Sequence, residues 1–240
     1  MHQYISKLLI AALLLVASVT DVLAVSPYSY IPKNAHQYLP VLKKEIVDYF
    51  PEFPYYAYFS GLIEQESCIS LTSNGCWNPK TQLLTAREEG AGLGQLTKAF
   101  NKNGKVRFDS LEAMRELHSK ELKDLSWSNV LVRPDLQMRT IILMSKDNYN
   151  RLSMSKSPLD RIAFSDAAYN GGLGGLFNDR RICGLTKGCD PNVWDNNVER
   201  TCSKSKVAIY GHQSPCDINR THVHNVLLIR MAKYSPLLNK

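Results

Sequence analysis

The fold of this chain is decided by one short stretch, Tyr55-Tyr56-Ala57-Tyr58-Phe59-Ser60-Gly61-Leu62-Ile63-Glu64-Gln65-Glu66-Ser67. Pro51 and Pro54 precede it, and prolines favour the end of one helix and the first turn of the next. On a helix that turns ~100° per residue, Leu62 and Ile63 lie within ~60° of Phe59. The stretch therefore predicts a helix with a broad apolar face.

Two glutamates lie on this helix in different surroundings. With Phe59 at zero and a turn of ~100° per residue, Glu66 falls at about 340°, inside the apolar face, and Glu64 at about 140°, opposite it. A carboxyl group among apolar side chains favours its neutral, protonated form, which is the form that a general acid needs. The pattern predicts that Glu66 is a general acid/base and that Glu64 is a solvated charge. The alternative is that Glu66 is a structural carboxylate paired with a neighbouring Arg or Lys.

The rest of the sequence predicts a mostly helical, α+β protein. Further helices are expected over residues 34–50, 109–125, 133–152, 157–169, 190–198 and 219–232. Residues 69–95 are rich in turn signals, so we expect irregular structure with room for a small hairpin beside the helix at 55–68. No Pro/Gly/Ser linker long enough to separate two domains interrupts residues 25–240, which are expected to form a single domain held together by disulfides.

The N-terminal residues 1–24 have the layout of an export signal. His2 and Lys7 precede an apolar run from Leu8 to Val19, and small residues precede Val25. The run is short for a membrane-spanning helix of ~20 residues. We expect either a cleaved signal peptide or a retained anchor over residues 8–25, and only the anchor would make the inner membrane a partner. Either form exports the domain to the periplasm or the extracellular space.

The cysteines agree with export. The six are Cys68, Cys76, Cys183, Cys189, Cys202 and Cys216. An even number after an export signal predicts three disulfides. Six cysteines allow fifteen pairings, and the short separations favour pairing each cysteine with its neighbour in the sequence. A zinc site with His212, His222 or His224 is the competing interpretation, but no Cys-x-x-Cys pair supports it.

The charge points to an anionic partner. The net charge of the 240 residues is +7, which suits nucleic acid, a membrane surface or a bacterial cell wall. A nucleic-acid binder would carry Lys and Arg interleaved with aromatic residues on one face, and here the basic residues are scattered. We therefore expect no nucleic-acid partner.

Three short motifs carry a resemblance to a known family. They are Glu66-Ser67, Gly90-Ala91-Gly92-Leu93-Gly94-Gln95 and Ala168-Tyr169-Asn170-Gly171-Gly172. Each motif alone is weak, but the three in this order resemble the soluble lytic transglycosylases. The stretch 87–95 and the tail from Cys183 to Arg220 are most similar to bacteriophage members. The resemblance covers roughly residues 55–235.

This resemblance implies a lysozyme-like fold and a role for each matching residue. Glu66 would protonate the glycosidic oxygen and then act as a base, and Ser67 would orient its carboxyl group. Residues 90–95, with Gly92 and Leu93, would form the wall of a sugar cleft. Gln95 would hold an N-acetylated sugar there. Tyr169 would lie near Glu66, and Asn170 would line the cleft.

The reaction that the family performs uses a single carboxylate. The 6-hydroxyl of MurNAc attacks its own anomeric carbon, so the MurNAc–GlcNAc β-1,4 bond breaks and a 1,6-anhydro end forms. The resemblance implies peptidoglycan glycan strands as the partner, no cofactor, no metal and a monomeric enzyme. It suggests phage-driven wall degradation, and it leaves open host lysis, entry or a bacterial housekeeping role.

Two departures from the family pattern keep other functions open. Gly94 replaces the usual Met before Gln95, which is expected to open the cleft wall, and Arg87 replaces a usual Ser. Candidates for a second carboxylate are Glu88, Glu89 and Glu199. With one of them the protein would be a hydrolytic muramidase, since hydrolases pair two carboxylates. A secreted wall-binding module without catalysis is the third function. His118, His212, His222 and His224 are expected to be surface or packing residues.

Overall fold

The computed structural model describes residues 29–68, 70–208 and 211–238. Helices dominate this part of the chain, and the strands form one antiparallel sheet, which confirms the mostly α expectation. The expected signal or anchor at residues 1–24 lies outside the described residues. None of the described helices is long and apolar enough to cross a membrane.

The α-helices are α1 (Lys33–Tyr49), α2 (Ala57–Ser67), α3 (Ser110–Leu117), α4 (Pro134–Asn150), α5 (Pro158–Gly171), α6 (Leu173–Gly184), α7 (Pro215–His224) and α8 (Met231–Tyr234). Two 3-10 turns, η1 (Val130–Val132) and η2 (Val198–Arg200), and a π-helix, η3 (Asn225–Arg230), complete the helical elements. Several starts are capped by side chains: Asp109 accepts from the backbone N–H of Glu112, and Ser157 from that of Asp160. The helix expected over 190–198 is instead a run of turns that ends in η2.

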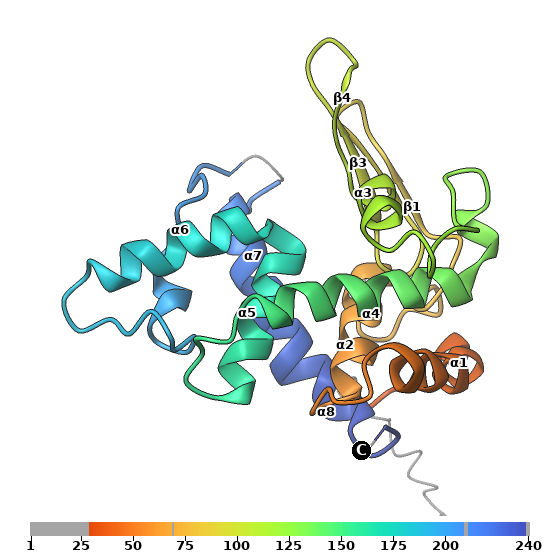
Figure 1. Cartoon of the computed structure of the whole chain (residues 1–240), viewed down its shortest axis with the longest axis horizontal. Helices are drawn as coiled ribbons and strands as arrows, with labels where there is room; N and C mark the ends of the chain where they lie inside the picture. Colours follow the sequence, from red (N-terminus) through yellow and green to blue (C-terminus); the bar gives the residue numbers. More distant parts are fainter. Residues whose placement is uncertain (1–28, 69, 209–210, 239–240) are drawn as a thin grey trace, which may run out of the picture.

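Helix α2 lies at the centre of the molecule (Figure 1). It packs against α1, α8 and η3, so it is buried on nearly every side. Gly61 allows η3 and α8 to come close, because a Cβ there would lie 2.9 Å from the backbone nitrogen of Met231 and 3.0 Å from the carbonyl oxygen of Val226. The C-terminal helices therefore cover the side of α2 that the apolar periodicity predicted to face solvent.

The strands form an arm that extends from the helices (Figure 1). They are β1 (Gln82–Leu84), β2 (Glu88–Ala91), β3 (Leu96–Phe100) and β4 (Val106–Asp109), in that order and all antiparallel. The small hairpin expected within 69–95 is thus a larger sheet that continues to Asp109. The two strands within residues 96–109 were not expected because they are only five and four residues long, too short to show a clear alternation of apolar and polar residues.

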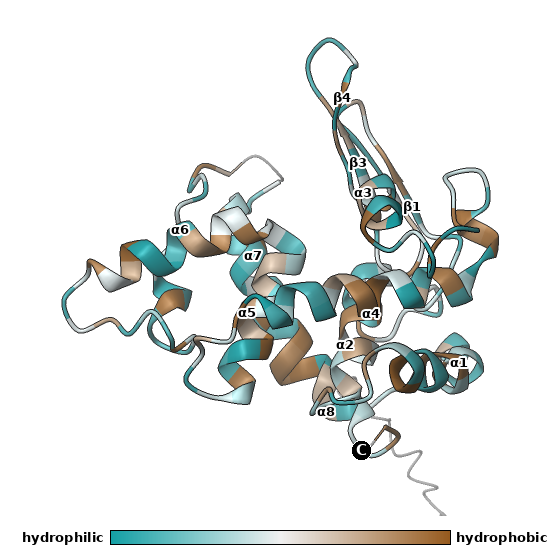
Figure 2. Cartoon of the chain, in the orientation of Figure 1, coloured by the Kyte–Doolittle hydropathy of each residue, from teal (hydrophilic) through white to brown (hydrophobic). Residues whose placement is uncertain are grey.

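The apolar interior has three parts. The largest surrounds α2 and includes residues of α1, α4 and the C-terminal helices; the second lies among α5, α6 and α7; the third lies where the sheet meets α3 and α4. Figure 2 shows hydrophobic segments on the central and C-terminal helices. Helix α4 contributes to two of these parts, so it fixes the arm relative to the central helices.

Three disulfides close loops around the helical part. They join Cys68 to Cys76, Cys183 to Cys189, and Cys202 to Cys216, which confirms the pairing that the short separations favoured. All six thiols are used, so the zinc site with cysteine ligands is not formed. Disulfides of this density are typical of proteins that fold in an oxidising, exported environment.

Candidate functional site

An open cleft separates the sheet from the ends of α5 and α7. It consists of two adjoining hollows of about 840 and 890 Å³. The residues that line both hollows are Glu88, Gly94, Gln95, Thr97, Arg107, Tyr169, Asn170 and Gly171. Each hollow is within the ~300–1,000 Å³ that ligand pockets commonly have, and together they form an elongated groove rather than a closed cavity.

Glu66 lies in this cleft at the last turn of α2. It lines the second hollow, and 15% of its side chain is exposed. Its carboxyl oxygen Oε1 lies 2.7 Å from Nε2 of His222 on α7. The sequence therefore identified a residue whose carboxyl group contacts a histidine and lies in the cleft.

His222 links Glu66 to a second, fully buried carboxylate. Its Nδ1 lies 2.8 Å from Oδ2 of Asp166, which is on α5 and has no exposed side-chain surface. Oδ1 of Asp166 accepts a hydrogen bond of 3.2 Å from the hydroxyl of Tyr58. Asp166, His222 and Glu66 thus form one continuous line of hydrogen bonds from the interior to the cleft.

Charge within this line favours the protonated form of the histidine. Burial lowers the pKa of His222, but the charges and hydrogen bonds of Asp166 and Glu66 outweigh burial and raise the pKa to about 10. Near neutral pH the ring is then an imidazolium that donates from both nitrogens. Burial, followed by the charge of Asp166, raises the pKa of Tyr58 well above its ordinary value, so Tyr58 stays a neutral donor.

The glycine-rich segment forms one wall of the cleft. Gly90, Gly94 and Gln95 line the second hollow. The hydroxyl of Tyr169 donates to the carbonyl of Gly94 at 2.8 Å, and a Cβ on Gly94 would lie 2.6 Å from that hydroxyl and 2.5 Å from Ile141. The glycine at position 94 therefore does not open the wall as expected, because Tyr169 and Ile141 occupy the space.

Three residues expected to bind substrate lie behind the wall. The side chain of Leu93 is fully buried in the core, and its backbone N–H donates to Gln137 at 2.7 Å. Gly92 has φ +75°, and a Cβ there would lie 2.5 Å from Gln137. Ser67 donates to the carbonyl of Ile63 at 2.6 Å and accepts from the N–H of Trp77 at 2.9 Å, so its bonds hold the loop after α2 instead of the Glu66 carboxyl.

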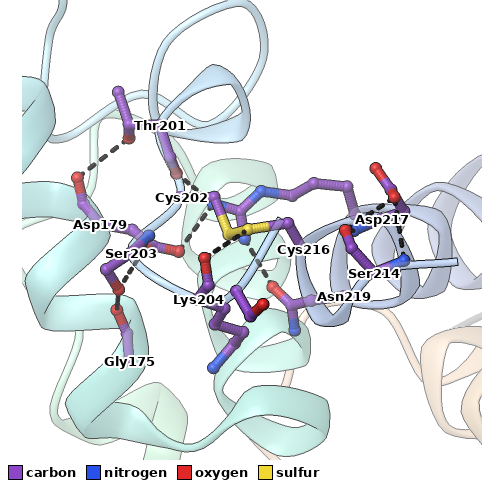
Figure 3. The surroundings of a disulfide bond; sticks show 12 residues. Gly175, Asp179, Thr201, Cys202, Ser203, Lys204, Ser214, Cys216, Asp217 and Asn219 are labelled. Carbon is purple, nitrogen blue, oxygen red and sulfur yellow. Dashed lines mark hydrogen bonds and ion pairs between the residues drawn. A yellow bond between two sulfur atoms is a disulfide. The ribbon is translucent and has the colours of Figure 1, made fainter. Parts of the chain in front are cut away.

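The opposite wall comes from the end of α5 and the start of α7. Asn170 lines both hollows, and its side-chain oxygen accepts from Asn219 at 2.9 Å. Lys204 donates to the carbonyl of Gly171 at 2.6 Å and lines the second hollow; burial lowers its pKa. The Cys202–Cys216 disulfide joins the loop that contains Lys204 to the first turn of α7 (Figure 3).

The three candidates for a second carboxylate are placed differently. Glu88 lines both hollows. Glu89 is the next residue on β2, so it faces the other side of the sheet, where it lies 4.0 Å from Lys98. Glu199 is in η2, outside both hollows, and its carboxylate accepts from the backbone of Asn196. Only Glu88 shares the cleft with Glu66.

Glu64 is not the solvated charge that the helical wheel predicted. Its side chain is fully buried, and Oε1 lies 2.5 Å from Lys233 and 3.6 Å from Arg230. The hydroxyl of Tyr234 donates to the other carboxyl oxygen. The prediction was wrong because η3 and α8, which are distant in the sequence, cover that face of α2.

Sequence reasoning also missed the partners of Glu66. His222 was expected to be a surface or packing residue, and Asp166 was not singled out. One signal was present: Asp166 is the only charged residue in the otherwise apolar and small run 162–168 of α5, and a lone buried carboxylate requires a partner. The identity of that partner, 56 residues later, follows only from the tertiary structure.

Compared with models of known protein families and with curated proteins, the sequence matches none of them. The function is therefore argued from the residues of the cleft.

Proposed function

We propose that this protein is a peptidoglycan lytic transglycosylase with a lysozyme-like fold and with Glu66 as its acid/base. The observation that carries the proposal is the position of Glu66, at the end of a buried helix, in an elongated cleft between a small sheet and a helical lobe. Gln95, Tyr169 and Asn170 line the same cleft. The family resemblance assigns substrate contacts to these three residues, whereas Ser67, Gly92 and Leu93, to which it also assigns them, do not line the cleft.

The cleft supplies the elements of a single-carboxylate reaction. Glu66 gives its proton to the glycosidic oxygen while the bond between that oxygen and the anomeric carbon of MurNAc breaks. The 6-hydroxyl oxygen of the same MurNAc then bonds to the anomeric carbon, and its proton passes to Glu66. The residue ends as it began, so no second carboxylate is consumed. His222 leaves Oε2 of Glu66 to perform both transfers.

The charges around the cleft suit the wall polymer. Arg87, Arg107 and Lys204 line the second hollow together with Glu66 and Glu88. Stem peptides of peptidoglycan carry carboxylates, and cationic side chains along a groove attract such a polymer. The net charge of +7 adds a longer-range attraction to an anionic wall. The phage-driven role in wall degradation rests on the resemblance alone.

A hydrolytic muramidase is the second candidate, and Glu88 is the observation that favours it. Glu88 lines the cleft with Glu66 and could position a water molecule, as a second carboxylate does in inverting glycosidases. Both candidates cleave the same bond. They differ in whether the 6-hydroxyl or a water molecule attacks the anomeric carbon.

The experiment is mass spectrometry of the soluble fragments released from purified peptidoglycan. Wild type is compared with Glu66→Gln and with the matched control Glu89→Gln, a carboxylate on the other face of the sheet. We expect fragments lighter by one water than hydrolytic muropeptides from wild type and the control, and none from Glu66→Gln.

The other outcomes separate the alternatives. Fragments with reducing ends from wild type, lost in Glu88→Gln, would establish the muramidase. If wild type binds the wall and releases no fragments, the protein is a wall-binding module and not an enzyme. A folded Glu66→Gln protein with near-normal turnover would contradict the assignment of the acid/base.

A further inference from the structure

We propose that His222, supported by Asp166, is a positioning residue that fixes the Glu66 carboxyl group and places a positive charge beside it. This inference rests on the proposed function for its catalytic meaning. The contacts themselves do not depend on that function: they join Glu66 of α2, Asp166 of α5 and His222 of α7 inside the molecule.

The contacts restrict both ends of the imidazole. Nε2 lies 2.7 Å from Oε1 of Glu66, and Nδ1 lies 2.8 Å from Oδ2 of Asp166. Only 5% of the His222 side chain is exposed, and Asp166 is fully buried. A buried ring with a carboxylate at each nitrogen cannot rotate without losing both hydrogen bonds, so it holds Glu66 in one orientation.

The titratable groups near the ring come from three helices, and two of them, Glu66 and Asp166, act on its charge. Helix α2 presents Glu66 and the neutral hydroxyl of Tyr58, and α5 presents Asp166 and Tyr169. On α7 itself, Arg220 is paired with Asp179 at 2.7 Å, and His224 is exposed. Two carboxylates thus face one imidazole, an arrangement that favours the imidazolium.

The position of α7 depends on a second network. Asp179 of α6 is buried and accepts from the backbone and hydroxyl of Ser203, at 2.6 and 2.7 Å, and from Arg220. Asn219 donates to the carbonyl of Ala167 on α5 at 3.0 Å. Figure 3 shows Asp179, Ser203 and Asn219 around the Cys202–Cys216 disulfide. The ring of His222 is therefore set by the packing of α7 on α5 and α6.

The charge has a chemical consequence at each stage of the proposed reaction. After Glu66 has given its proton to the leaving oxygen from Oε2, the N–H of His222 stabilises the new carboxylate at Oε1. When Glu66 takes the proton of the 6-hydroxyl, the same hydrogen bond remains. His222 keeps its own proton throughout, so it acts through Glu66 and does not touch the substrate.

The activity test measures kcat, KM and the pH profile of peptidoglycan cleavage. The variants are His222→Gln and Asp166→Asn, with His224→Gln as the control on the exposed side of α7. We expect His222→Gln to lower kcat about 10²-fold with little change in KM, as for a misplaced catalytic group. The basic limb of its profile should move to higher pH, because loss of a neighbouring cation favours the protonated carboxyl. His224→Gln should match wild type.

A second measurement does not require activity. NMR of the 15N-labelled imidazole follows the titration of His222 in folded wild type and in Glu66→Gln. We expect the ring to remain protonated at pH 8 in wild type and to titrate at lower pH in Glu66→Gln, because one of its two carboxylates is gone.

The two measurements separate the inference from the proposed function. If wild type cleaves peptidoglycan and His222→Gln keeps the kcat and the pH profile of wild type, the inference is overturned and the proposed function is retained. If wild type releases no fragments, the proposed function fails and the NMR titration alone decides the coupling. Identical titration of His222 in wild type and Glu66→Gln would overturn the inference in either case.

Discussion

The ammonium group of Lys233 lies 2.5 Å from the carboxylate of Glu64, and neither side chain has exposed surface. Arg230 and Tyr234 reach the same carboxylate, and Trp77 donates to the hydroxyl of Tyr234 at 2.8 Å. This cluster ties η3 and α8 to α2, two residues before Glu66. Burial lowers the pKa of Lys233 and of Arg230, while the Glu64 carboxylate opposes that change.

Replacing Glu64 by Gln should therefore destabilise the protein. The variant leaves two buried cations without their carboxylate, and loss of one partner of a buried ion pair costs about 3–5 kcal/mol. Thermal denaturation followed by circular dichroism measures the effect, with the exposed Glu116→Gln as the control. Equal melting temperatures for Glu64→Gln and wild type would contradict the role of the cluster and support the solvated charge that the helical wheel predicted.

A methyl group at position 94 should disturb the cleft wall. In Gly94→Ala the new Cβ would lie within 2.6 Å of Ile141 and of the Tyr169 hydroxyl, so Tyr169 must move. Overpacking of this kind costs about 1–3 kcal/mol, and we expect a loss of peptidoglycan cleavage as well. Gly174→Ala is the matched control, because nothing lies within 4 Å of a Cβ there. Full activity of a folded Gly94→Ala would show that the position of Tyr169 is unimportant.

Two of the three disulfides should differ in their importance for the site. Removal of Cys202–Cys216 by a double Ser substitution frees the loop that carries Ser203 and Lys204 from the first turn of α7. We expect a loss of about 2–4 kcal/mol and a marked loss of activity. The Cys183–Cys189 bridge closes a shorter loop at the end of α6, so its removal should affect stability more than turnover. Thiol titration of native protein that finds six free cysteines would contradict all three bridges.

His222 should make stability depend on alkaline pH. The folded-state pKa of about 10 lies above the ordinary value of 6.5, so the stabilisation is complete below pH 6.5 and is lost as the pH rises toward 10. Melting temperatures of wild type and His222→Gln should differ most near pH 6 and converge near pH 10. A difference that is constant over this range would show that the ring does not titrate in the folded protein as stated.

Local sequence signals predicted the elements that depend on neighbouring residues. The apolar period identified α2, and the caps at Asp109 and Ser157 identified the starts of α3 and α5. Pairing of near cysteines was predictable for the same reason. The strands from Leu96 onward were not predictable, because such short strands are stabilised by their cross-strand partners more than by intrinsic preference.

The site was predictable only in part. Glu66 lies on the apolar face of its own helix, and that face is visible in the sequence. The exposure of Glu64 was predicted wrongly, because a helical wheel takes no account of other helices that pack on the opposite face of α2. His222 carries no local signal, since its partners Glu66 and Asp166 are 156 and 56 residues away. Long-range polar pairs of this kind are determined by tertiary packing.

The distance in sequence between Glu66 and His222 has a consequence for the order of synthesis. A chain is synthesised from its N-terminus, so the residues of α2 and of the glycine-rich wall are made before those of α7. Until α7 has docked on α5, Glu66 has a carboxyl group but no imidazole behind it, and the Cys202–Cys216 bridge cannot close. A nascent or truncated chain therefore has no assembled site. The acid/base proposed at Glu66 therefore gains its neighbouring imidazole only when the last helices have formed.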